Sequence, residues 1–204
     1  MNFPRAGTTI LYLPVFANIS AIYKRMSHAA MRAGRNPEDV RLVAVSKTAD
    51  VGRIKEAAEA GQRIFGESRV QEASAKVQEL RGLNIEWHMI GHLQKNKAKK
   101  AVELFDLIHS VDSEELMRLL DGHAREMGKT QRALIEVNIA GEGSKHGVGE
   151  DEISRLLKTA DGMGNLKIDG LMTIPPYSED PERSRPFYKR LKALSDKHGL
   201  REAS

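Results

Sequence analysis

The feature that most constrains this 204-residue chain is a regular alternation of short apolar runs with helical patterns. Strand, loop, helix and glycine stop recur in this order, which is the pattern of parallel βα units. Strands that are buried on both faces read as continuous apolar runs, as these do. The sequence therefore predicts an α/β fold with a parallel sheet, whose strands are expected at residues 42–45, 64–65, 85–90, 107–111, 133–139 and 168–174.

The helices are placed by their end signals. Asp50 is expected to cap a helix that ends at Gly61, and Asp112 with Glu115 forms an Asp-x-x-Glu variant of the capping box before a helix that ends at Gly128. No low-complexity linker or break in composition interrupts the chain, so a single domain over residues 1–204 is expected. Further helices are expected at about 17–34, up to Leu80, at 151–163 and at 181–198, the last ending at Gly199.

The βα pattern alone allows two architectures, the (β/α)₈ barrel and the open doubly wound sheet. In both, the functional site lies at the carboxyl ends of the strands. The polar residues at or just after the carboxyl ends of the expected strands are therefore candidates for the site, and they include Lys47, Ser68, His92, Asp112, Asn138 and Thr173.

Lys47 stands out among these residues because it directly follows an apolar strand. In a barrel mouth its stem would be desolvated, and a desolvated lysine offers the neutral amine that a Schiff base requires. The plainer interpretation is a solvated lysine at the end of a strand, and lysines are mostly exposed. The strand pattern leaves both interpretations open.

The other candidate sites have weaker signals. His88 and His92 have the i, i+4 spacing of some zinc ligands, but Gly91 between them argues against a helix and therefore against that site. Lys145 lies in a glycine-containing loop that has no Walker spacing, so an anion contact is the alternative to a simple flexible loop. The lysine run at 95–100 is either a solvated helix face or a nucleic-acid patch, and no aromatic residues interleave with it for base stacking.

Composition excludes several protein classes. The chain has no cysteine, which rules out disulfides and thiolate chemistry and fits a reducing cytoplasm. The net charge of +4 favours anionic partners without choosing among them. The apolar patch at 10–16 is too short for a membrane span and only Arg5 precedes it, so we interpret it as neither a targeting nor a membrane segment.

Several motifs together resemble the pyridoxal phosphate (PLP) homeostasis protein family. Trp-His-Met-Ile-Gly-His-Leu-Gln-Lys-Asn-Lys at 87–97 is the longest and most specific of them. Val-Ala-Val-Ser-Lys-Thr at 43–48 resembles the family's cofactor-lysine strand, and Phe-Gly-Glu-Ser-Arg-Val-Gln-Glu at 65–72 its second-strand motif. Shorter matches follow in the family's order, at 108–112, 137–139, 144–147 and 170–172.

The resemblance implies both fold and function. The family is similar to the N-terminal barrel of alanine racemase, a fold-type III PLP fold, which favours the TIM-type (β/α) barrel over the open sheet. It implies PLP as cofactor and an intracellular role in vitamin B6 homeostasis, as a carrier or buffer without robust turnover. PLP-dependent apoenzymes are then candidate partners, and a cytoplasmic monomer or weak self-association is expected. Carried over by position, Lys47 holds PLP as a Schiff base and the pocket is lined by Ser68, His88, Asn138 and Met172.

Two departures from the family pattern matter. Ser68 stands where the family commonly has Asn, which still offers a hydrogen-bonding side chain. The chain ends at Ser204, before the family's last strands and most of its phosphate contacts, so an incomplete barrel with weakened PLP binding is expected. Two alternative functions stay open. One is a racemase-like PLP enzyme, which needs a second catalytic base, and the other is a nucleic-acid-binding module built on the lysine run.

Overall fold

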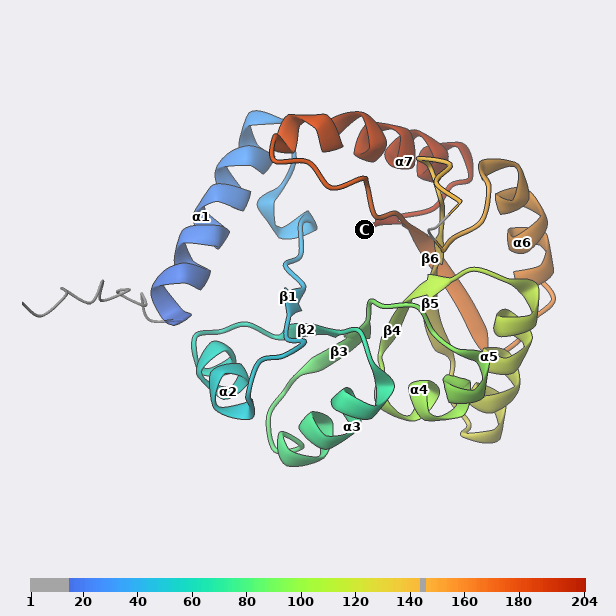
Figure 1. The fold of residues 1–204 in the computed structure, drawn as a ribbon, viewed down its shortest axis with the longest axis horizontal. Coiled ribbons are helices and arrows are strands. Elements are labelled where there is room, and N and C mark those ends of the chain that lie inside the picture. The colour runs from blue at the N-terminus through green and yellow to red at the C-terminus, as the bar shows by residue number, and fades with distance from the viewer. Residues whose placement is uncertain (1–14, 144–145) are drawn as a thin grey trace, which may run out of the picture. The chain divides into compact units, whose positions relative to one another are not determined.

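The structure is a computed structural model that describes residues 15–143 and 146–204 (Figure 1). The chain forms two compact units, Met1–Leu42 with Ala49–Gln62, and Val43–Thr48 with Arg63–Ser204. Compactness alone does not show whether the units fold separately, so the single domain expected from the sequence stays a prediction. Among the described helices, none is long and apolar enough to cross a membrane.

The first unit is helical. Its elements are α1 (Val15–Arg32), the short 3₁₀ helix η1 (Pro37–Asp39) and α2 (Val51–Glu59). Helix α1 confirms the N-terminal helix expected at about 17–34. The Tyr23 hydroxyl donates a hydrogen bond of 2.8 Å to Gln62 Oε1 and so ties α1 to the residue that follows α2. The Asp50 side chain accepts from the backbone N–H of Arg53, as expected for the cap of α2.

The second unit contains a parallel sheet with the strand order β1-β2-β3-β4-β5-β6-β7. The six expected strands are present, each displaced by no more than three residues at either end. The sheet curls into an incomplete barrel with helices on its outer side, which confirms the barrel over the open doubly wound sheet (Figure 1). The strands are β1 (Ala44–Val45), β2 (Ile64–Glu67), β3 (Glu86–Met89), β4 (Leu107–Val111), β5 (Gln131–Glu136), β6 (Leu166–Met172) and β7 (Glu202–Ala203).

The helices of this unit confirm most of the expected end signals. Gly128 and Gly199 have φ values of 64° and 66°, a conformation that suits the glycine after a helix. The capping box expected at Asp112 and Glu115 is wrong, because α5 begins one residue later and Ser113 is its cap, accepting from the N–H of Leu116. The helices are α3 (Val70–Glu79), α4 (Ala98–Leu104), α5 (Glu114–Glu126), α6 (Ile153–Ala160) and α7 (Arg185–Lys197), with short 3₁₀ turns η2 (Lys95–Lys97), η3 (Glu150–Glu152) and η4 (Pro181–Ser184).

Alternate strand residues point into the barrel and are sorted by polarity. Leu107, Leu134 and Met172 form a buried apolar cluster there. Nearer the amino-terminal ends of β3 and β5, Arg132 Nε donates to Asp169 Oδ2 at 2.6 Å and Arg132 Nη1 lies 3.4 Å from Glu86 Oε1. The packed side chains fill the barrel below the carboxyl ends of the strands, and those ends stay available for a site.

Strand β7 approaches β6 so closely that only glycine fits between them. Gly170 pairs with Glu202, and a Cβ added to Gly170 would lie 2.0 Å from the backbone O of Glu202. Since that neighbour is backbone, the clash cannot be relieved by turning a side chain. The position therefore depends on the missing Cβ of glycine.

Gly170→Ala should lower the free energy of unfolding by about 1–3 kcal/mol, the usual cost of overpacking. Gly122→Ala is the matched control, because Gly122 lies inside α5 with no atom within 4 Å of an added Cβ. This control should raise the free energy of unfolding by roughly 0.5–1 kcal/mol. Urea unfolding measures the free energy of unfolding of both variants. A Gly170→Ala protein as stable as the wild type would contradict the β6–β7 pairing.

Candidate functional site

Lys47 follows β1, an edge strand of the sheet, and is exposed. The ladder continues one residue past β1, where the Ser46 N–H donates to the backbone O of Gly66 at 2.9 Å. Val43 and Val45 line a hollow at the strand ends, and alternate residues of a strand share a face. Lys47 is the next residue in that alternation, but it lies in the turn after β1 and is not among the residues that line the hollow. The desolvation expected for Lys47 from the sequence is not seen, because β1 has a strand neighbour on one side only.

The hollow beside Lys47 has a volume of about 320 Å³. Most of its lining is apolar, and its polar side chains, those of His109, Thr173, Tyr188 and Ser204, come from four different segments. Small-ligand sites commonly combine such an apolar lining with a few placed polar groups. The lining residues are Val43, Val45, Ile90, His109, Met172, Thr173, Ile174, Pro175, Tyr188 and Ser204.

A buried lysine holds the backbone on both sides of Lys47. Lys76 Nζ donates to the backbone O of Ser46 and to Glu67 Oε1, each at 2.8 Å, and to Glu72 Oε1 at 2.7 Å. Glu72 Oε1 in turn accepts the Thr48 N–H at 2.8 Å. We call Lys76, Glu67 and Glu72 the lysine clamp. It fixes the carbonyl before Lys47 and the N–H after it.

The lysine clamp stabilises a backbone conformation that would otherwise be costly. Thr48 has a φ of 65°, a left-handed conformation that is a rare outlier for a β-branched residue. A hydrogen bond from its N–H to a carboxylate offsets this cost. The strained residue lies directly after Lys47, which indicates that the clamp sets the backbone conformation on both sides of Lys47.

Charge pairing keeps the clamp ionised. Burial works to lower the pKa of Lys76, but the hydrogen bonds and charges of Glu67 and Glu72 outweigh it, so the pKa lies above the ordinary lysine value. The hydrogen bond from Lys76, followed by that from the Thr48 N–H, holds the pKa of Glu72 below its usual range. Glu67 has no exposed side-chain surface, and its Oε1 accepts from Lys76 Nζ at 2.8 Å and from the Ser46 hydroxyl at 2.6 Å.

A row of hydrogen bonds leads from the hollow into the barrel. His109 Nδ1 lies 3.0 Å from Ser204 Oγ, and His109 Nε2 lies 2.9 Å from His88 Nδ1. His88 Nε2 reaches Glu86 Oε1 at 2.9 Å. One assignment of protons satisfies the row with both rings neutral: Ser204 donates to His109, His109 to His88, and His88 to Glu86.

The five residues expected in the site are therefore only partly together. Met172 lines the hollow, whereas Lys47 lies in the turn after β1 and His88 lies one hydrogen bond behind the lining. The lining residue in that place is His109, which the sequence analysis did not single out. Its signal was available, because His109 is the central residue of an expected strand, two positions after Leu107 on the inner face.

Ser68 lines a separate hollow of about 500 Å³ with His92 and Lys97. Gly91 makes this arrangement possible, since a Cβ there would lie 2.5 Å from the backbone O of Ser68. Asn138 follows β5, and its Nδ2 donates to the backbone O of Glu142 at 2.9 Å. Its buried Oδ1 has no hydrogen-bond partner in the described part of the chain.

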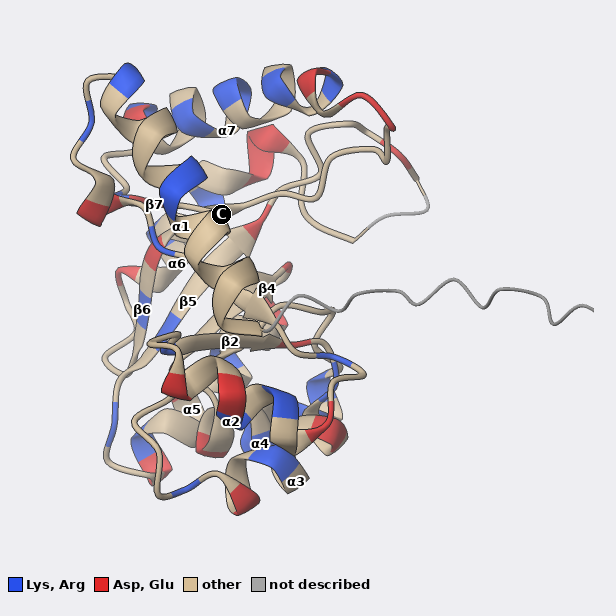
Figure 2. Cartoon of the chain, turned by 90° about the vertical axis from the view of Figure 1, so that its left-hand side faces the viewer, with Lys and Arg blue, Asp and Glu red and all other residues tan. Residues whose placement is uncertain are grey.

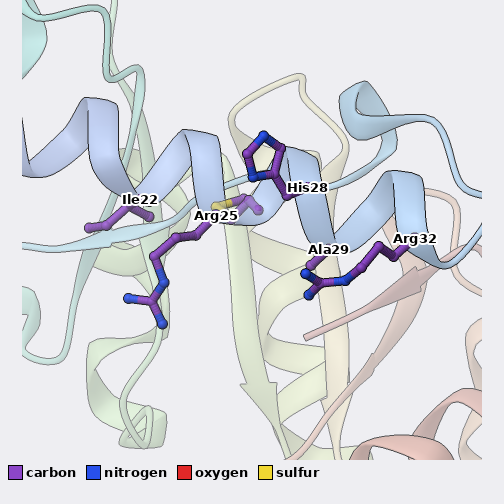
Figure 3. Close-up of a pocket in the computed structure, with 6 residues that line it drawn as sticks. Ile22, Arg25, His28, Ala29 and Arg32 are labelled. Carbon is purple, nitrogen blue, oxygen red and sulfur yellow. The ribbon is translucent and has the colours of Figure 1, made fainter.

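Two other surface features contain none of the expected site residues. A hollow of about 550 Å³ runs along α1 and includes Ile22, Arg25, His28 and Arg32 (Figure 3). Basic residues recur along α7, where Arg190 pairs with Glu150 and Lys192 with Asp196 (Figure 2).

The lysine run begins in η2 and continues into α4. Lys95 pairs with Glu115, and Lys100 Nζ lies 2.7 Å from Glu103 Oε2. Lys99 and Lys100 are exposed residues of α4, which agrees with the interpretation of the run as a solvated helix face.

The chain is similar in sequence and in fold to several known proteins. Residues 17–201 match the family model for the alanine racemase N-terminal domain. The pyridoxal phosphate homeostasis protein of Aquifex aeolicus (strain VF5) is 39% identical over 178 residues, covering 87% of this chain and 78% of the relative. PipY of Synechococcus elongatus PCC7942, solved with PLP bound, is 37% identical with a TM-score of 0.75, covering 89% of this chain and 87% of that one. An alanine racemase of Clostridium difficile 630, at 14% identity and a TM-score of 0.69 over 93% of this chain and 49% of that one, shares the fold.

Lys76→Met should destabilise the protein by about 3–5 kcal/mol, because it leaves the buried Glu67 carboxylate without its cation. Adding Glu67→Gln removes that charge and should restore a large part of the loss. Urea unfolding of the single and double variants measures both effects. A double variant no more stable than Lys76→Met would contradict the role assigned to Glu67.

Glu72 should give the clamp a pH dependence of known sign. Its pKa is lowered in the folded protein, so its interactions stabilise the fold above the ordinary carboxyl pKa and are lost as the pH falls through the lowered value. The stability difference between wild type and Glu72→Gln should therefore be largest near neutral pH and shrink below about pH 4. Thermal unfolding across that range tests this, and a difference that grows on acidification would refute it.

Proposed function

Because the chain belongs to the pyridoxal phosphate homeostasis protein family and contains the alanine racemase N-terminal domain, we propose that it binds PLP through a Schiff base on Lys47. We further propose that it acts in the cytoplasm as a PLP carrier or buffer, with PLP-dependent apoenzymes as recipients. The observation that supports the proposal is the position of Lys47 two residues after Val45, which lines an apolar hollow, with the backbone on both sides of Lys47 held by the lysine clamp.

The residues around the hollow suit such a cofactor. When bound, PLP supplies an aldehyde that condenses reversibly with an amine, together with an anionic phosphate. Val45, Ile90 and Met172 offer an apolar wall for a flat ring, and His109 offers a ring nitrogen at the same wall. The buried Asn138 Oδ1, without a partner among the described residues, is an acceptor suited to a polar substituent of a ligand. Ser68 and His88 then support the site from neighbouring positions.

A carrier needs little beyond reversible attachment. Lys47 is exposed, so water or an amine of a recipient protein can reach an imine formed there. The clamp fixes the backbone but leaves the Lys47 side chain free to turn. An exposed Lys47 side chain on a fixed backbone supports loading and release of PLP rather than catalysis in a closed site.

A racemase-like enzyme is the second candidate, and one observation favours it. His109 lines the hollow and is hydrogen-bonded to His88, which could take up or deliver a proton at the wall of the site. An assay for amino-acid racemisation with PLP present distinguishes the two functions. Turnover that is lost in His109→Gln supports the enzyme, and PLP binding without turnover supports the carrier.

Lys47→Ala should abolish the imine absorbance band that PLP gives with the wild-type protein. Borohydride reduction followed by peptide mass spectrometry should find the fixed cofactor on Lys47. Lys99→Ala is the control, since Lys99 is an exposed lysine of α4 and its loss should leave the band unchanged. Reduced PLP found at one specific lysine other than Lys47 would overturn the assignment.

A further inference from the structure

Three potential metal ligands meet at the carboxyl ends of three adjacent strands. His92 follows β3, Asp112 follows β4, and His146 lies in the connection after β5. One ligand atom from each lies within 4.8 Å of the others. Residues so far apart in the sequence converge only because parallel strands bring their ends to one edge. The histidine pair considered in the sequence analysis was His88 with His92, and the structure groups His92 with different residues.

The spacing of these atoms is close to that of a metal site. His92 Nδ1 lies 3.3 Å from Asp112 Oδ2. Two ligands on one tetrahedral zinc ion, each about 2.0–2.1 Å from it, are roughly 3.3 Å apart. The His92 and His146 rings are stacked with their centroids 3.7 Å apart, so one ring must tilt before both nitrogens face one ion. His146 is suited to this movement, because it is exposed and precedes Gly147, whose φ is 103°.

A buried carboxyl, Glu136, lies near this group. Glu136 is the last residue of β5 and is 7% exposed, and the N–H of Val148, two residues after His146, donates to its backbone O at 2.9 Å. Buried carboxyls are normally hydrogen-bonded or paired, so a cation held by His92, Asp112 and His146 would offer Glu136 a nearby opposite charge.

We propose that His92, Asp112 and His146 bind a divalent transition metal ion of the zinc class. Two imidazoles with a carboxylate favour zinc and its neighbours over Mg²⁺ and Ca²⁺, which prefer oxygen ligands alone. Ring stacking by itself would explain the contact between His92 and His146 but not the convergence of Asp112 on the same point. A metal ion accounts for all three side chains.

The bound ion would join the segments that follow β3, β4 and β5. These segments lie at the same end of the sheet as Lys47, so the ion would fix part of the rim around the cofactor hollow. None of the three ligands is Lys47 or a member of the lysine clamp. The proposal is therefore independent of PLP binding.

The test is a titration of metal-stripped protein with Zn²⁺, by calorimetry or competition with a chromophoric chelator. One ion per chain is expected. His92→Asn and His146→Asn should each weaken binding by at least about 10–100-fold, the loss usual even for residues that only orient a ligand. Lys47→Ala should bind Zn²⁺ as the wild type does, which separates this site from the proposed PLP function.

His123→Asn is the matched control. His123 Nδ1 lies 3.3 Å from Glu126 Oε2, the same separation as in the His92–Asp112 pair, yet it faces a single carboxylate on α5. Its loss should leave Zn²⁺ binding unchanged, and circular dichroism confirms that each variant is folded. Absence of saturable Zn²⁺ binding, wild-type affinity in both His92→Asn and His146→Asn, or equal binding of Mg²⁺ would each overturn the proposal.

Discussion

Parallel pairing of the strands is the constraint on which the rest of this structure depends. It brings the carboxyl ends of β1 to β7 to one edge, so that Lys47, Asp112 and Asn138, which are far apart in the sequence, all lie at the same end of the sheet. Parallel strands also require helical crossovers, which cover the outer face and leave the inner face to side chains. The hollow beside Lys47 follows from that arrangement, because residues alternate between the two faces of each strand.

A second interaction, the lysine clamp, converts this architecture into a defined site. Parallel pairing places Lys47 at a strand end but does not fix the direction of its backbone. Lys76 does so by bonding the carbonyl before Lys47 and, through Glu72, the N–H after it. A buried lysine between two carboxylates is an uncommon arrangement for a surface near a strand end, since burying charges costs free energy unless they are paired. Its presence here is explained by the left-handed Thr48 that it stabilises.

Local sequence patterns were sufficient for the elements of the fold but not for the contacts between them. Continuous apolar runs, and helical patterns with glycine and Asp50 signals at their ends, located six strands and most of the helices to within a few residues. Helix α4 was indicated only as one interpretation of the lysine run. The family motifs located Lys47 as well. The cap of α5 was placed one residue early because Asp112 and Ser113 are both good caps, and in the folded chain Asp112 faces His92 instead.

The remaining features depend on strand register, which no local pattern specifies. Lys76 looks like an ordinary helical lysine until the fold places it against Ser46 and Glu67. Strand alternation could place His109 on the inner face, but only the strand register shows that His109, with His88 behind it, lines the hollow.

The central claim is that Lys47 and the hollow beside it form one site. A diffraction structure of the protein with PLP tests this most directly. We predict electron density continuous from Lys47 Nζ into the hollow lined by Val45, His109 and Met172, with Thr48 still left-handed and hydrogen-bonded to Glu72. Density for the cofactor in the hollow of Ser68 and His92, or on another lysine, would contradict the account.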